Sequence, residues 1–75
     1  MPRYANRRGD SSVVAYEIDE DSITVEFEGG ARYVYTYQSA GSANVEQMKR
    51  LAIAGEGLQT FINRVVKKGY AKKLR

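Results

Sequence analysis

The C-terminal segment of the chain holds the largest group of side chains that could bind a ligand. Residues 57–75 contain six cations and no acidic residue. Clustered charges of one sign attract a polyanion, because their potentials add and persist over about 8 to 10 Å at physiological salt. We select five of these cations as candidate phosphate contacts for a nucleic acid: Arg64, Lys67, Lys68, Lys72 and Lys73.

A solvated helix end followed by a basic tail is the competing interpretation of these cations. The helix macrodipole favours Lys and Arg in a last turn by about 0.3 to 1 kcal/mol each at low salt. This effect could account for Arg64, Lys67 and Lys68. It does not account for Lys72 and Lys73, which follow the helix-ending Gly69.

Tyrosine is the dominant aromatic residue, with six copies against two phenylalanines and no tryptophan. Tyr33, Tyr35 and Tyr37 alternate along one segment, so their rings either pack a core or form a surface on which bases stack. We predict that Tyr33 and Tyr35 are mainly core residues that shape or line the surface beside the cations. Tyr37 and Tyr70 are the candidate stacking rings.

The composition argues against most enzymatic chemistry. There is no cysteine and no histidine, which removes thiol nucleophiles, disulfides, the usual zinc ligand sets and the commonest general base. Asp19, Glu20 and Asp21 are consecutive, whereas calcium loops space their ligands, so we interpret them as a turn. We predict a protein that is not an enzyme and has no metal and no cofactor.

The length of 75 residues predicts a single domain with a small core, and the net charge of +3 is unevenly distributed. All nine acids lie in residues 10–56, so both ends are basic and the middle is acidic. The sequence contains no apolar run of the length that export or membrane insertion requires. We therefore expect a cytoplasmic protein without a membrane partner.

Hydrophobic periodicity predicts an α+β fold, in which a three-stranded antiparallel meander is followed by two helices on one face of the sheet. We expect a flexible basic arm over residues 1–10, a single β-β-β-α-α domain over residues 11–70 and a basic tail over residues 71–75. In the first strand, Val14, Tyr16 and Ile18 should share one face and Val13, Ala15 and Glu17 the other.

The hairpin loop decides on which face Tyr33 and Tyr35 lie, because a slip of one residue exchanges the faces of a strand. A two-residue turn at Gly29 and Gly30 would bury Arg32 and expose the rings. A three-residue loop over residues 28–30, with Gly30 left-handed, places both rings on the face of Ile23, Val25 and Phe27. We choose the three-residue loop, because it also pairs Glu26 with Arg32.

Apolar spacing then changes to the helical period. Residues 38–43 should be a connector, and Asn44 and Gln47 could form a capping box for a helix over residues 44–54. Its inward stripe should consist of Val45, Met48, Leu51 and Ala52. Glycines at 55 and 57 end this helix, and a second helix should run from Leu58 to the cap at Gly69.

The order and spacing of these motifs resemble the KTSC domain family, which is named for a short domain at the C-terminus of some lysyl-tRNA synthetases and also occurs as single-domain bacterial proteins. The resemblance spans residues 11–70. It rests on Ser11-Ser12, Ile23-x-Val25-x-Phe27-x-x-Gly30-x-x-Tyr33-x-Tyr35, Gly57 and Phe61-Ile62-Asn63. It implies a small domain for which the synthetase location suggests RNA binding.

Two functions follow as hypotheses. The first is a module that binds RNA or another single-stranded nucleic acid through the basic C-terminal helix and tail. The second is a protein-interaction or homo-oligomerisation module, in which an open sheet edge pairs with another chain.

Overall fold

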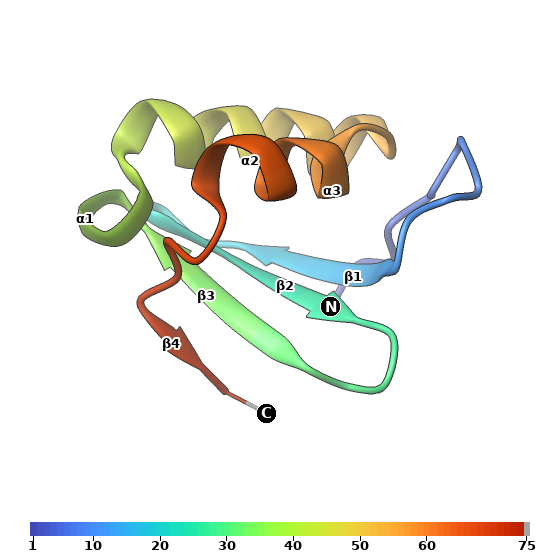
Figure 1. Cartoon of the computed structure of the whole chain (residues 1–75), viewed down its shortest axis with the longest axis horizontal. Coiled ribbons are helices and arrows are strands. Elements are labelled where there is room, and N and C mark those ends of the chain that lie inside the picture. The colour runs from blue at the N-terminus through green and yellow to red at the C-terminus, as the bar shows by residue number, and fades with distance from the viewer. Residues whose placement is uncertain (75) are drawn as a thin grey trace.

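The computed structural model describes residues 1–74 and has the predicted α+β fold (Figure 1). Its antiparallel sheet has the strand order β1-β2-β3-β4, the helices of residues 42–66 lie on one face of it, and the short helix of residues 37–40 lies at the end of the strands. The strands are β1 (Val13–Ile18), β2 (Ser22–Phe27), β3 (Arg32–Thr36) and β4 (Lys72–Lys73). The helices are α1 (Tyr37–Ala40), α2 (Ser42–Ala54), α3 (Leu58–Phe61) and the π-helix η1 (Ile62–Val66).

The hairpin between β2 and β3 has the predicted three-residue loop. The Phe27 amide donates to the Ala31 carbonyl at 2.8 Å, and the Gly30 amide donates back to Phe27 at 3.0 Å. Gly30 has a φ of +92°, a backbone conformation that is strained for any residue with a side chain. Val25 therefore pairs with Tyr33, and the tyrosines of β3 point toward the helices, as predicted.

The core lies between the sheet and the helices. Val45, Met48 and Ala52 recur at helical spacing on α2 and are buried as predicted, while the fourth member of the predicted stripe, Leu51, is half-buried against the core. The largest fully buried side chains are Val13, Ile23, Val25, Tyr35, Val45, Met48 and Leu58. Burying a large apolar side chain contributes about 1.5 to 3 kcal/mol, so this layer is the main source of stability.

The faces of β1 differ from the prediction because the strand contains a bulge. Val13 pairs with Phe27 and Tyr16 with Val25, so Val13 and Tyr16 share the face that looks toward the helices. The extra residue, Val14, interrupts the alternation of two that the sequence suggested. Val13 is consequently part of the core.

The second predicted helix has two parts and ends early. After α3 the helix widens into η1, where the Lys67 amide donates to Ile62 at 2.6 Å, five residues back. Lys67 then takes a positive φ of 49°, so the helix ends before Gly69. A side chain at Gly69 would lie 2.9 Å from the Val66 carbonyl oxygen, which makes close approach, rather than capping, the reason for glycine there.

The connector over residues 38–43 contains a short helix that the sequence analysis missed. Thr36 and Ser39 form the capping box of α1: the Ser39 amide donates to the Thr36 hydroxyl at 3.1 Å, and the Thr36 amide to the Ser39 hydroxyl at 3.0 Å. The predicted box at Asn44 and Gln47 does not form, because α2 already begins at Ser42 and the side-chain Nδ2 of Asn44 donates to the Ala40 carbonyl.

Both edges of the meander are covered by the ends of the chain, so the sheet has four strands rather than three. The amides of Ala71 and Leu74 donate to β3 at 2.6 and 2.7 Å, and this pairing creates β4. At the other edge, the Tyr4 amide donates to Val14 at 2.9 Å, and the Tyr16 amide to Pro2 at 3.0 Å. The expected mobile arm over residues 1–10 is thus bonded to β1.

Candidate functional site

The five candidate phosphate contacts are all exposed, and they lie on three consecutive pieces of the fold. One is in η1, two are in the turn that follows, and two are in β4. Among residues 1–74 the ion pairs are Arg8–Glu56, Arg32–Glu26 and Lys49–Glu46, so none of the five has an acidic partner there. Their charge is available to an external anion.

The register of β4 places its two lysines on opposite faces of the sheet. Lys73 pairs with Tyr33 on the helix-covered face, and its Nζ lies 5.7 Å from the centre of the Tyr33 ring. This distance is within the range of a cation–π contact. Lys72 pairs with Val34 and therefore belongs to the uncovered face. The structure brings Lys73, but not Lys72, to the predicted tyrosines.

Four aromatic rings form a cluster beside β4. The Tyr33 and Tyr70 rings lie 4.6 Å apart, and Tyr33 also meets Phe27 edge-on at 5.7 Å. Tyr35 is only 2 % exposed, so it cannot contact a ligand, as its predicted core role implies. Burial, with smaller effects of Tyr33 and Tyr70, raises the pKa of Tyr35 to about 12. Tyr33, Tyr70 and Phe27 are half-buried and form the accessible part of the cluster.

The uncovered face of the sheet is not a stacking surface. Its residues in β2 and β3 include Thr24, Val34 and Thr36, and β1 to β4 place no aromatic side chain there. Arg32 and Glu26 also lie on this face, 3.3 Å apart. The buried Arg32 Nε nevertheless has no hydrogen-bond partner in residues 1–74, so this pair is held by charge alone.

Tyr37 is not a free stacking ring. Its hydroxyl donates to Glu46 Oε2 at 2.5 Å and lies 3.2 Å from the Glu20 carbonyl, while Lys49 Nζ lies 2.8 Å from Glu46 Oε2. The hydrogen bond to Glu46 raises the pKa of Tyr37, and the Lys49 ammonium, followed by Tyr37, lowers the pKa of Glu46. A polyanion would be repelled by these neighbouring acids.

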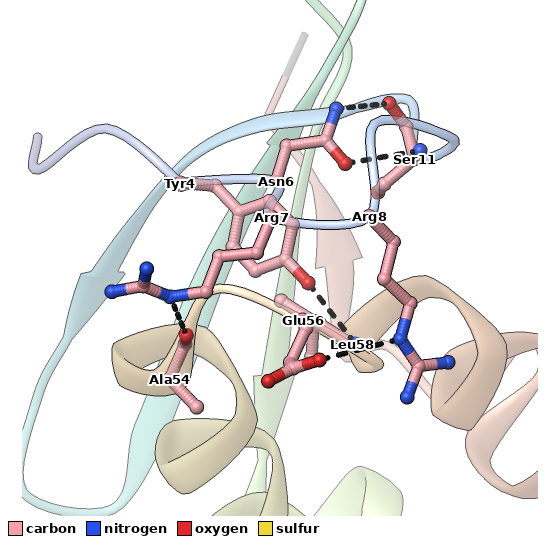
Figure 2. Close-up of polar contacts among 8 residues, drawn as sticks. All are labelled: Tyr4, Asn6, Arg7, Arg8, Ser11, Ala54, Glu56 and Leu58. Atoms are coloured by element: carbon pink, nitrogen blue, oxygen red, sulfur yellow. Dashed lines mark hydrogen bonds and ion pairs between the residues drawn. The ribbon is translucent and has the colours of Figure 1, made fainter.

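The N-terminal arm builds a second site that the sequence analysis missed. Figure 2 shows Tyr4, Arg7 and Arg8 pointing from the arm toward the connection between α2 and α3. The Tyr4 hydroxyl accepts from the Leu58 amide at 3.2 Å, and Arg7 Nε donates to the Ala54 carbonyl at 2.8 Å. Arg8 Nε lies 3.3 Å from Glu56 Oε1. An aromatic residue inside an otherwise polar arm was the available sequence signal.

A polar cavity of about 170 Å³ lies between the arm and α3. It is lined by Tyr4, Asn6, Arg8, Asp10, Ser11, Glu56, Gly57, Gln59, Thr60 and Asn63. Two hydrogen bonds of 3.2 Å between Asn6 and Ser11 hold the arm in its turn above this cavity. The cavity therefore exists only because the arm is folded back.

Within residues 1–74, no three His, Cys, Asp or Glu side chains are grouped so that they could hold a metal. None of the helices in this part of the chain is long and apolar enough to cross a bilayer. The comparisons with known protein families, with curated proteins and with solved structures find no match to this chain.

Proposed function

We propose that the protein binds single-stranded nucleic acid, and RNA in particular, through the basic surface formed by Arg64, Lys67, Lys68, Lys72 and Lys73. The observation that carries the proposal is the set of five exposed cations that have no acidic partner within residues 1–74. Tyr33 and Tyr70 supply accessible ring area beside Lys73. Base–aromatic stacking tolerates any sequence, because every base has a π-face.

The distribution of charge supports a polyanion over a small anion. The cations follow one another along η1, the next turn and β4, so they can contact successive phosphates of a strand. Four neutralised phosphates on a single strand would give a slope of log affinity against log salt of roughly −3. Lys72, on the uncovered face, contributes mainly at long range.

The resemblance to the KTSC domain family supports the same proposal, and we propose that the chain is related to that family. The motif residues Val25, Tyr33 and Tyr35 lie together in the paired strands β2 and β3. Val25 and Tyr35 are buried and hold the sheet against the helices, whereas Tyr33 is half-buried and keeps part of its ring accessible. The RNA suggestion therefore depends mainly on the cations, with Tyr33 as a supporting ring.

We propose binding without catalysis. Shifted pKa values occur at Tyr35, Tyr37 and Glu46, and each shift follows from burial or from an intramolecular hydrogen bond. Such shifts can mark catalytic groups, but structural contacts produce them as well.

Fluorescence anisotropy with a labelled single-stranded RNA, titrated at several salt concentrations, tests the proposal. Lys67→Ala with Lys68→Ala should weaken binding to every sequence and make the salt slope shallower by about 1.4. Arg3→Ala with Arg50→Ala removes the same charge from exposed positions elsewhere and is the matched control. Absence of binding at low salt, or equal losses in both double variants, would contradict the proposal.

The alternative function, pairing with another chain at a sheet edge, has a structural cost. Both edges of the meander already pair with the ends of the same chain, through Pro2 to Tyr4 and through Ala71 to Leu74. A partner strand would have to displace one of them. Light scattering over a range of protein concentrations tests this alternative, which predicts a mass that rises with concentration.

A further inference from the structure

The polar cavity beneath the arm has the size and the chemistry of a binding site for one planar polar group. Its volume of about 170 Å³ is roughly ten times what a single buried water needs. Nine of its ten lining residues have polar or charged side chains, and the tenth is Gly57. A purely apolar ligand would leave these groups desolvated without partners, so the cavity selects a ligand that hydrogen-bonds.

Several lining groups have unused hydrogen-bonding capacity within residues 1–74. Gln59 accepts the Ser12 amide through Oε1 at 2.5 Å, which leaves its amide nitrogen free to donate. The Tyr4 hydroxyl accepts from Leu58, so its own hydrogen is free. Thr60 and Asn63 make no side-chain hydrogen bond to this part of the chain. Donors and acceptors therefore line the cavity on both the arm side and the helix side.

The charge of the cavity excludes a phosphate. Arg8 is matched by Glu56, with which it pairs, and Asp10 adds a further negative charge to the lining. An anion inside the cavity would meet two carboxylates and one guanidinium. A neutral ring with carbonyl and amino groups meets complementary partners, because carboxamides and carboxylates recognise the edges of bases.

The cavity adjoins the basic surface. Asn63, which lines the cavity, immediately precedes Arg64 in the sequence. Thr60, which also lines it, lies four residues before Arg64, so Thr60 and Arg64 lie on neighbouring turns of one helical face. We propose that the cavity takes one unstacked base of the strand whose phosphates contact Arg64, Lys67 and Lys68. This inference rests on the proposed function and assigns base recognition to Gln59, Thr60 and Asn63.

Free nucleosides test the cavity independently of the phosphates. Each of the four common ribonucleosides is titrated to its solubility limit while the side-chain amide signals of Gln59 and Asn63 are followed by NMR. We expect at least one nucleoside to shift both signals in the wild type. No shift with any nucleoside would overturn the inference.

Strands with and without bases separate this inference from the proposed function. An RNA should bind the wild type about tenfold more tightly than an abasic chain of equal length. Asn63→Leu, which keeps the side-chain size, should lose most of this preference but keep the salt slope. Gln38→Leu, an exposed amide on α1, is the matched control and should change neither.

The outcomes are distinguishable. If Asn63→Leu keeps the full preference for base-bearing RNA, the rings of Tyr33 and Tyr70 account for it and the cavity inference is wrong, while phosphate binding stands. If neither strand binds at low salt, the proposed function fails, and the nucleoside titration alone decides whether the cavity binds a base.

Discussion

The two ends of the chain are both basic, but their cations have different surroundings in the structure. At the N-terminal end, Arg7 and Arg8 are bonded to Ala54 and Glu56, and Tyr4 fills part of the core. At the C-terminal end, the cations remain exposed and without acidic partners in residues 1–74. Clustered positive charge therefore indicates a ligand site only where the fold supplies no partner for it.

The difference follows from what each end lies against. The arm reaches the C-terminal end of α2, where the Ala54 carbonyl and the negative end of the helix dipole attract Arg7. Glu56 follows immediately and attracts Arg8. Every acid precedes residue 57, and η1 and β4 present none.

Replacing Tyr4 should lower the free energy of unfolding more than any other change proposed here. A small loss would contradict the contrast between a packed N-terminal end and an exposed C-terminal end. Tyr4 is 6 % exposed and hydrogen-bonded to Leu58, so Tyr4→Ala should lower the free energy of unfolding by about 3 kcal/mol. Tyr70→Ala, at the half-buried C-terminal counterpart, should cost about 1 to 2 kcal/mol. Urea denaturation measures both, and equal losses would show that the ends contribute alike.

Gly55→Ala should detach the arm at a smaller cost. The added Cβ would lie 2.6 Å from the Ala5 Cβ, and Gly55 has a φ of +79°, which alone costs about 1 to 2 kcal/mol for alanine. Gly29→Ala, with a φ of +89° but open space around it, is the matched control for backbone strain. Hydrogen exchange at Tyr4 and Arg7 should accelerate only in Gly55→Ala, and protection retained in both variants would contradict this packing.

The aromatic cluster at the C-terminal end should make stability depend on pH above the physiological range. The folded pKa of Tyr35, about 12, exceeds the ordinary value of 10.0, so the folded state favours the neutral phenol. The resulting stabilisation is complete below pH 10 and is lost as the pH rises toward 12. Tyr35→Phe should flatten the fall of the urea midpoint over this window, and an unchanged fall would assign it to other tyrosines.

Exposed charges at either end should have the smallest effect on stability. Arg8→Ala breaks an exposed ion pair and should cost about 0.5 kcal/mol or less, and Lys68→Ala should change stability by a similar amount or not at all. Only Lys68→Ala should weaken RNA binding through phosphates. A thermal melt combined with anisotropy on both variants checks this contrast, which fails if Arg8→Ala weakens binding to an abasic chain.

The hairpin and the core were predictable because local chemistry specifies them. Two glycines after Glu28 and the alternation of Val25 and Phe27 determined the loop, the register and the inward direction of Tyr33 and Tyr35. The apolar spacing on α2 identified its buried stripe. The clustering of the five cations was predictable because no acid follows residue 56, but only the structure shows that none of them pairs with a more distant acid within residues 1–74.

The remaining features depend on contacts between distant parts of the chain. Tyr4 bonds to a residue 54 positions away, so neither its burial nor the cavity is encoded in a local pattern. The bulge at Val14 and the strand made of Lys72 and Lys73 contradict local preferences, because alternation and β-propensity both argue against them. The edge of β3 supplies the hydrogen-bonding groups that make a strand of Lys72 and Lys73 despite their low β-propensity.

The hydrogen bonds that join both chain ends to the sheet also have a practical consequence. Removal of either terminal segment by a protease would leave a row of unpaired backbone amides and carbonyls, from which fibrillar aggregation can start. A fusion partner attached directly before Pro2 or after Leu74 would pull on the same hydrogen bonds. Expression vectors for this protein should therefore place a flexible spacer at whichever terminus carries the purification tag.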